Sequence, residues 1–125
     1  MTTQLARVKA VLEQHPDLSR DGFRFDIYAS GSPYSNENFP ENRAALLNPW
    51  HQEQIATVCE FLKQDEIRKR DGSYGLKHAI ERWGNEAGLC GYITNGCAIV
   101  GALLSGYTVV REKNSPNCRF KFKKL

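Results

Sequence analysis

The chain has 125 residues and a net charge of +3, and hydrophobic and charged residues make up 41% and 25% of it. This composition is that of an ordinary globular protein, so it excludes a disordered chain, and the length predicts a single domain over residues 1–125. The longest apolar run has about eight residues, far fewer than the ~20 that a membrane-spanning helix needs. The first residues hold no apolar segment like those of secretory signals. We therefore expect a cytoplasmic protein without membrane association.

The first half of the chain predicts two helices, with a short strand and a long loop between them. Apolar residues at helical spacing over 3–14 indicate an amphipathic helix, and alternation over 23–28 indicates a strand. Residues 30–42 are rich in Ser, Asn, Gly and Pro, and loops of this length are usually functional. Asn48 and Pro49 suit the N-cap and the first position of a second helix, whose apolar stripe follows at the spacing of one helix face.

Two further helices are predicted in the second half. Ser73 is expected to cap a third helix, and Trp83 on its apolar side and Trp50 in the second helix are both expected in the core. The fourth helix, over residues 95–106, has no charged residue on any face. A helix of that kind is buried all round and organises a core. Gly106 stands where a left-handed residue commonly ends a helix.

The C-terminal segment predicts an antiparallel hairpin. Residues 107–111 are β-branched, residues 118–123 alternate apolar with basic, and a turn-forming segment separates them. The fold class is therefore α+β, with about four helices, a short N-terminal strand and a C-terminal hairpin. Two helices before a hairpin match the order of a winged helix-turn-helix, but the fourth helix offers only apolar side chains. Because base edges are read by polar side chains, it is not expected to enter a DNA groove.

Positive charge gathers at the C-terminal end. From residue 111 onward six Lys and Arg face one Glu, giving +5, whereas the first 110 residues hold 11 basic and 13 acidic residues, giving −2. A basic row of this kind contacts phosphates and contributes affinity without sequence information, although Lys on an edge strand also discourages aggregation. The predicted nucleic-acid-binding residues are Arg111, Lys113, Arg119, Lys121, Lys123 and Lys124.

The cysteines and histidines predict no metal site and no cofactor. The chain has four Cys and three His, and no pair of cysteines has the short spacing of a zinc or redox motif. Cys59 and Cys97 fall on apolar helix faces, so buried free thiols are expected. The even number of cysteines leaves disulfide pairing open.

Two other groups of residues are candidates for function. Tyr74, Lys77 and His78 form a possible polar site, in which His78 could act as a general base and Lys77 could hold an anion. No nucleophile stands at a diagnostic spacing from His78, so catalysis is the weaker interpretation. Tyr34 and Phe39, in the predicted loop, are aromatic residues of the type that anchors protein interfaces.

A pattern in the second half resembles a group of small proteins. It consists of Ser73-Tyr74-Gly75-Leu76-Lys77-His78, Tyr92, Asn95-Gly96, Ala102, Gly106-Tyr107, Pro116-Asn117 and Phe120. Residues 73–122 are similar to small accessory proteins encoded by phages, plasmids and other mobile elements, most of which have no assigned activity. The resemblance implies an accessory protein that acts by binding, as inhibitors of host defence such as anti-CRISPR proteins do. It supplies no catalytic or ligand residue.

The sequence therefore predicts a non-enzymatic binding protein from a mobile element that engages nucleic acid or a nucleoprotein through its basic hairpin. The first alternative is an anti-CRISPR-like inhibitor that docks on a host defence protein through the loop with Tyr34 and Phe39. The second is a small enzyme that uses His78. The sequence indicates neither the oligomeric state nor a choice between DNA and RNA.

Overall fold

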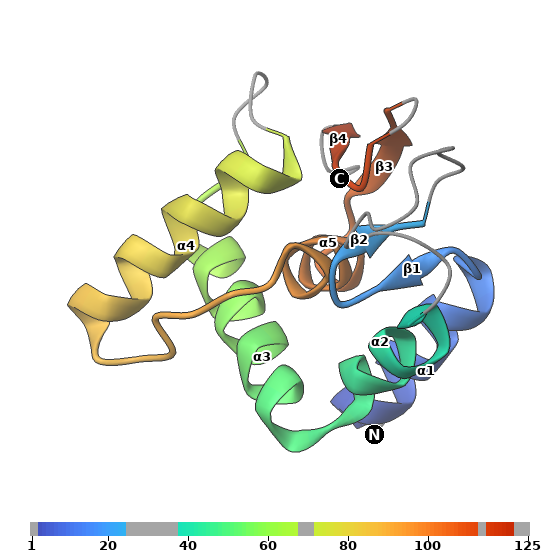
Figure 1. Ribbon diagram of the computed structural model, residues 1–125. Coiled ribbons are helices and arrows are strands. Elements are labelled where there is room, and N and C mark those ends of the chain that lie inside the picture. The colour runs from blue at the N-terminus through green and yellow to red at the C-terminus, as the bar shows by residue number, and fades with distance from the viewer. Residues whose placement is uncertain (1–2, 25–37, 68–71, 113–114, 122–125) are drawn as a thin grey trace.

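The structure, a computed structural model, describes residues 3–24, 38–67, 72–112 and 115–121. Figure 1 shows the elements in chain order. They are helix α1 (Gln4–Gln14), strands β1 (Leu18–Ser19) and β2 (Gly22–Phe23), helix α2 (Phe39–Ala44) with the 3₁₀ turn η2 (Ala45–Leu47), helices α3 (Pro49–Gln64), α4 (Ser73–Ala87) and α5 (Asn95–Leu104), and strands β3 (Thr108–Arg111) and β4 (Cys118–Lys121). The mixed α+β class with a C-terminal hairpin is confirmed.

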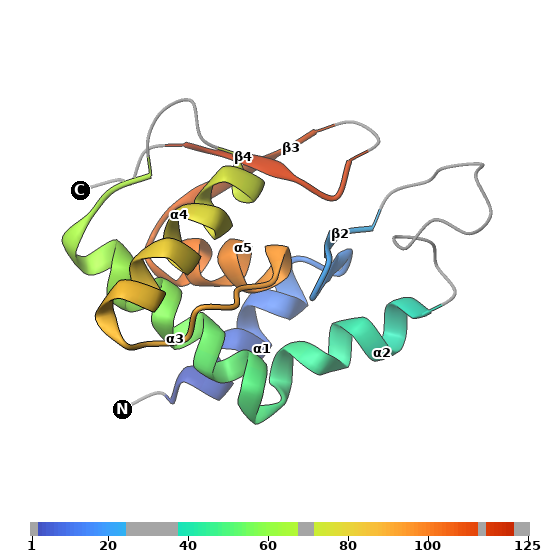
Figure 2. The same ribbon diagram turned by 60° about the vertical axis from the view of Figure 1, so that its left-hand side comes forward.

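Helix α5 lies at the centre of the molecule. It packs against α1, α3, α4, β2 and β3 (Figures 1 and 2), and residues 96–102 are all buried. Two glycines let it approach its neighbours closely: a Cβ on Gly96 would lie 1.9 Å from the backbone oxygen of Ser19, and one on Gly101 would lie 2.3 Å from the side chain of Val58. The prediction of a buried organising helix is confirmed, and α5 presents no surface for a DNA groove.

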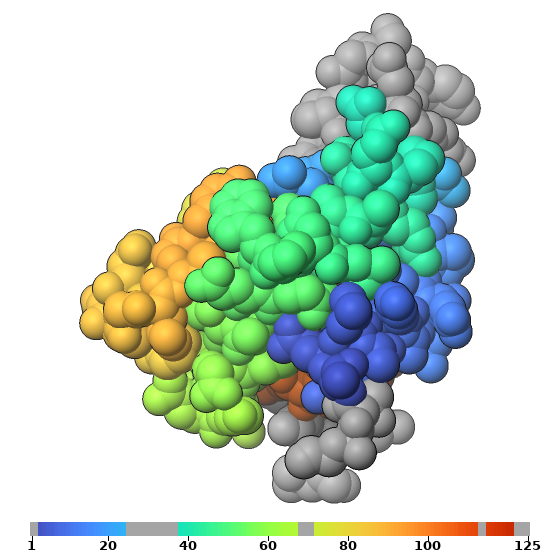
Figure 3. All heavy atoms as spheres, turned by 90° about the horizontal axis from the view of Figure 1, so that it is seen from below, coloured from blue at the N-terminus to red at the C-terminus, as the bar shows by residue number. Residues whose placement is uncertain are grey.

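Helices α3 and α5 begin at side-chain caps. The Asn48 side chain accepts a hydrogen bond from the His51 N–H at the start of α3, and Thr94 does the same for the Cys97 N–H at the start of α5. Gly106 follows α5 with a φ of +97°, as expected of a left-handed residue. On the side away from the β3–β4 hairpin, α1, α2 and α3 form most of the face shown in Figure 3.

Two small antiparallel hairpins complete the fold. Strand β1 pairs with β2, and β3 pairs with β4 from Thr108 opposite Lys121 to Arg111 opposite Cys118. Along β4 the burial alternates, so Cys118 and Phe120 face the helices while Arg119 and Lys121 face outward. The β3–β4 hairpin lies across α5 and the first turns of α4 (Figure 2).

Three local expectations were wrong. Of the predicted strand over 23–28, Phe23 lies in β2, and residues 25–28 lie outside the described part of the chain. The predicted loop contains α2, whose Phe39-Pro40 start is set by a proline in the first turn rather than by a side-chain cap.

The other two corrections concern a cap and a tryptophan. Gly72, not Ser73, is the N-cap of α4, because the Ser73 hydroxyl is buried and accepts a hydrogen bond of 3.1 Å from the Cys118 N–H. This bond ties α4 to β4. Trp50 is 48% exposed rather than in the core, whereas Trp83 packs against the apolar cluster as expected.

Candidate functional site

The predicted basic residues of the C-terminal hairpin lie on opposite faces of it. Because paired residues share a face, Arg119 and Lys121 point outward with Val110 and Thr108, whereas Arg111 shares the inner face with Cys118. The Arg119 side chain is 75% exposed, and its Nε lies 3.8 Å from Glu112. Lys113, Lys123 and Lys124 lie outside the described residues. The structure thus places Arg119 and Lys121 together and separates Arg111 from them.

Arg111 is used to hold the hairpin in place. Its guanidinium pairs with the Asp17 carboxylate at 2.9 Å, donates a hydrogen bond of 2.6 Å to the Arg24 carbonyl, and stacks 4.7 Å from the centre of the Phe23 ring. These contacts join β3 to the β1–β2 hairpin, which lies far away in the sequence. Arg111 therefore contributes to folding, and its guanidinium group is partly engaged before any ligand binds.

The two aromatic residues predicted for a protein interface are not described equally. Tyr34 lies outside the described residues. Phe39 begins α2 and is half-buried, with the Arg24 guanidinium 4.5 Å from the centre of its ring. The described part of this segment therefore presents a covered aromatic ring rather than a free one.

The predicted polar site lies on the first two turns of α4. The rings of Tyr74 and His78 make an edge contact with 4.5 Å between their centres. Glu81 accepts from Lys77 at 3.3 Å and from the Ile93 N–H at 3.0 Å, and it lies 3.2 Å from the His78 ring. Glu81 thereby fixes the Lys77 ammonium group against the segment that leads into α5.

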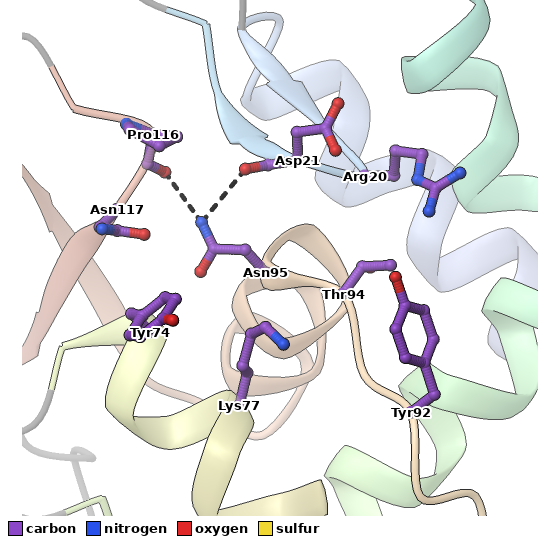
Figure 4. Close-up of a pocket in the computed structure, with 9 residues that line it drawn as sticks. All are labelled: Arg20, Asp21, Tyr74, Lys77, Tyr92, Thr94, Asn95, Pro116 and Asn117. Carbon is purple, nitrogen blue, oxygen red and sulfur yellow. Dashed lines mark hydrogen bonds between the residues drawn. The ribbon is translucent and has the colours of Figure 1, made fainter. Parts of the chain in front are cut away.

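A pocket of about 370 Å³ opens beside these residues. Four segments that are far apart in the chain form it: the β1–β2 turn, the start of α4, the segment leading into α5, and the segment leading into β4. Figure 4 shows Tyr74 on one side and Tyr92 on the other, with Lys77 and Asn95 between them. The lining residues are Arg20, Asp21, Tyr74, Lys77, Tyr92, Thr94, Asn95, Pro116 and Asn117.

Asn95 holds the walls of the pocket together. Its side-chain amide donates hydrogen bonds of 3.2 Å to the backbone carbonyls of both Asp21 and Pro116 (Figure 4). Next to it, the Gly96 N–H donates to the Arg20 carbonyl at 2.8 Å, an approach that a Cβ at position 96 would prevent. The start of α5 therefore positions the turn that carries Arg20.

The charges around the pocket are unevenly neutralised. Lys77 is balanced by Glu81, and the Asp21 carboxylate accepts a hydrogen bond of 3.1 Å from Asn42 and is turned away from Asn95 (Figure 4). Burial raises the pKa of Asp21, and the nearby Arg20 charge partly opposes that shift. The Arg20 Nε is buried and has no hydrogen-bond partner among the described residues, and none of their ion pairs includes Arg20.

Exposed aromatic rings surround the opening. Tyr74 is 57% exposed, and Tyr92 and Trp50 are each 48% exposed. Trp50 and Tyr92 stack in parallel with 5.3 Å between ring centres, and the Lys77 ammonium lies 5.9 Å from the centre of the Tyr92 ring. Sequence reasoning had singled out Tyr74 and Lys77. It had no signal for Arg20 or Trp50, while Tyr92, Asn95, Pro116 and Asn117 were present in the pattern that carries the resemblance.

The four cysteines are buried or half-buried. Burial raises the pKa of the Cys97 and Cys118 thiols to about 12, and burial also raises the pKa of Cys59. All four cysteines are free thiols. Within the described ranges, no group of three or more His, Cys, Asp or Glu side chains is placed to hold a metal ion. None of the helices described is long and apolar enough to cross a membrane.

Comparison with known proteins leaves the geometry as the basis for function. The chain matches no family model, no curated protein and no solved structure.

Proposed function

We propose that this protein binds nucleic acid without catalysing a reaction, through the outer face of the β3–β4 hairpin and the adjoining start of α4. The observation that carries the proposal is that Arg119 and Lys121 share the outward face of the β3–β4 hairpin. Both are exposed, whereas Arg111 is engaged by the β1–β2 hairpin. Such cations contact phosphates and provide affinity that does not depend on base sequence.

The hairpin is firmly joined to α4, which extends this surface toward aromatic residues. Gly72 pairs with Arg119 in a β-bridge, and the Cys118 N–H donates to Ser73. Tyr74 follows immediately and is exposed. Proteins that bind single strands combine backbone-tracking cations with aromatic rings on which bases stack. This combination favours a single strand over a duplex as the ligand.

The proposal is tested by fluorescence anisotropy with labelled single-stranded and duplex DNA and RNA across a range of salt concentrations. For a single strand, log K falls by ~0.7 per log unit of salt for each phosphate contact. Arg119→Glu combined with Lys121→Glu should therefore flatten the slope by about 1.4 and weaken binding at low salt. The matched control is Lys9→Glu with Lys63→Glu, which changes the charge equally at two exposed residues of α1 and α3 and should leave the slope unchanged.

Two results would overturn the proposal. One is the absence of binding by the wild-type chain at ~50 mM salt, where phosphate contacts are strong. The other is an equal loss of binding in the Lys9→Glu and Lys63→Glu control, which would show that only the net charge of the protein matters. The first result would favour the alternative of an inhibitor that docks on a host defence protein. An origin in a mobile element and a location in the cytoplasm remain predictions from the sequence.

A further inference from the structure

We propose that the pocket between α4, α5, the β1–β2 turn and the segment before β4 binds one nucleotide unit. In this arrangement the phosphate lies between Lys77 and the side of the pocket that carries Arg20, and the base stacks on Tyr74. The inference rests on the proposed function and names the part of the nucleic acid that this site would hold. It also applies to a free nucleoside monophosphate, because the two ligands share the same phosphate and ring.

The size and position of the pocket suit one nucleotide. A volume of about 370 Å³ lies at the small end of the range for small-molecule sites, ~300–1,000 Å³. Pro116 and Asn117 form one wall and lead directly into β4, where Arg119 and Lys121 face outward. A strand with one nucleotide in the pocket could therefore continue along the hairpin.

Arg20 is the cation of the pocket that has no ion-pair partner among the described residues. Arg20 has a buried Nε that no described residue satisfies, and a guanidinium group offers paired donors that match phosphate oxygens. Lys77 adds a second positive charge, which Glu81 both holds in position and partly neutralises. With Asp21 as the one acidic residue of the lining, the lining residues carry a net charge of +1. The start of α4, which has no side-chain cap, adds a partial positive charge close by.

Tyr74 is better placed than Tyr92 to stack on a base. Tyr92 already stacks on Trp50 and lies beside the Lys77 ammonium, so it forms a fixed wall. Tyr74 is the most exposed aromatic residue of the lining, and its ring makes an edge contact with His78. On the same side of the pocket (Figure 4), the Asn117 side chain supplies a donor and an acceptor for polar groups of the base or sugar.

The inference is tested by isothermal titration of the full chain with adenosine monophosphate, adenosine and inorganic phosphate. We expect the monophosphate to bind at least tenfold more tightly than either part alone, since both the phosphate and the ring are recognised. Tyr74→Ala should weaken its binding by about tenfold, the lower range of what one base stack contributes. Tyr74→Phe should stay within about twofold. Lys77→Gln and Arg20→Gln should each reduce the preference for the monophosphate over adenosine.

Controls separate this inference from the proposed function. Leu89→Ala removes an exposed apolar side chain that does not line the pocket and should leave monophosphate binding unchanged. The Arg119→Glu and Lys121→Glu pair should weaken binding of a single strand but leave monophosphate binding within about twofold. Anisotropy with strands that carry or lack a 5′-phosphate then shows whether the pocket takes the end of a strand or an internal nucleotide.

The possible failures are distinguishable. If single strands bind but Tyr74→Ala has no effect on either ligand, the pocket inference is overturned and the hairpin proposal stands. Equal affinity for inorganic phosphate and the monophosphate also overturns the inference, because the ring is then not recognised. If the monophosphate binds and single strands do not, the pocket is a site for free nucleotides and the proposed function is wrong.

Discussion

Helices α4 and α5 begin at the same pocket but contribute different things to it. Residues 96–102 of α5 are buried, and Asn95 and Gly96 fix the β1–β2 turn in place. Helix α4 buries one face and leaves Tyr74 and Lys77 at the pocket. The comparison shows that α5 holds the walls of the pocket in place, whereas α4 provides side chains that line it. Substitutions in α5 should therefore reduce stability, and substitutions on the first turns of α4 should reduce binding.

The largest expected effect is the protection of the thiols around α5. Because burial raises the pKa of Cys97 and Cys118 to about 12, only about one thiol in ten thousand would be ionised at pH ~8. We expect an alkylating reagent, followed by mass spectrometry of peptides, to modify both far more slowly in the folded protein than in urea. Rapid modification of Cys97 in the folded chain would contradict a closed core at α5.

The next effect is the loss of stability from a single methyl group at the start of α5. In Gly96→Ala the added Cβ would meet the backbone oxygen of Ser19. A backbone atom cannot move away by a change of side-chain rotamer. We expect a loss of about 3 kcal/mol in the free energy of unfolding, at the upper end for overpacking. Urea denaturation followed by circular dichroism measures it. A loss below about 1 kcal/mol would mean that the β1–β2 turn is not held closely against α5.

A smaller effect separates the two faces of the hairpin. Arg111→Ala removes an ion pair, a hydrogen bond to a carbonyl and a ring contact, so we expect a loss of about 1–2 kcal/mol in unfolding free energy. Arg119→Ala should stay within about 0.5 kcal/mol, because its side chain is mostly exposed. In fluorescence anisotropy, Arg119→Ala should weaken nucleic-acid binding more than Arg111→Ala does. Equal effects of the two variants on stability would contradict the assignment of faces.

The smallest effect concerns pH. Burial lowers the pKa of His51 and His15, and nearby Arg20 and Arg111, respectively, lower them further. The unfolded chain therefore binds more protons than the folded one below pH ~6.5, and stability should fall as the pH decreases through that value. Urea denaturation at about pH 7.5 and about pH 5.5 measures the decline. His51→Asn combined with His15→Asn should flatten it, and an unchanged decline would assign it to other groups.

The sequence predicted those parts of the fold that depend on local chemistry. Caps and apolar periodicity located α1, α3 and α5, and two-residue alternation located β4, because these signals lie within a few neighbouring residues. Helix α2 was missed because it has six residues and no side-chain cap. Trp50 was placed in the core because its position in the helix resembles a buried one, whereas tertiary packing leaves it stacked on Tyr92.

The pocket could be predicted only in part. Tyr74 and Lys77 are three positions apart on one helix, so their proximity followed from helical spacing. Asn95 reaches the Asp21 carbonyl across 74 positions of sequence, and no local pattern indicates that contact. The sequence grouped Arg111 with Arg119 as nucleic-acid-binding residues, and only the strand register shows that the two lie on opposite faces. Long-range contacts therefore decided which basic residues are available.

The most direct test of the central claim is a chemical-shift titration. Amide signals of the ¹⁵N-labelled chain would be followed during addition of adenosine monophosphate and then of a short single strand. We predict that the monophosphate shifts Tyr74, Lys77, Asn95 and Asn117, and that the strand also shifts Arg119 and Lys121. Shifts confined to α1 and α3, or no shifts with either ligand, would contradict the claim that α5 positions a binding site which α4 and the hairpin complete.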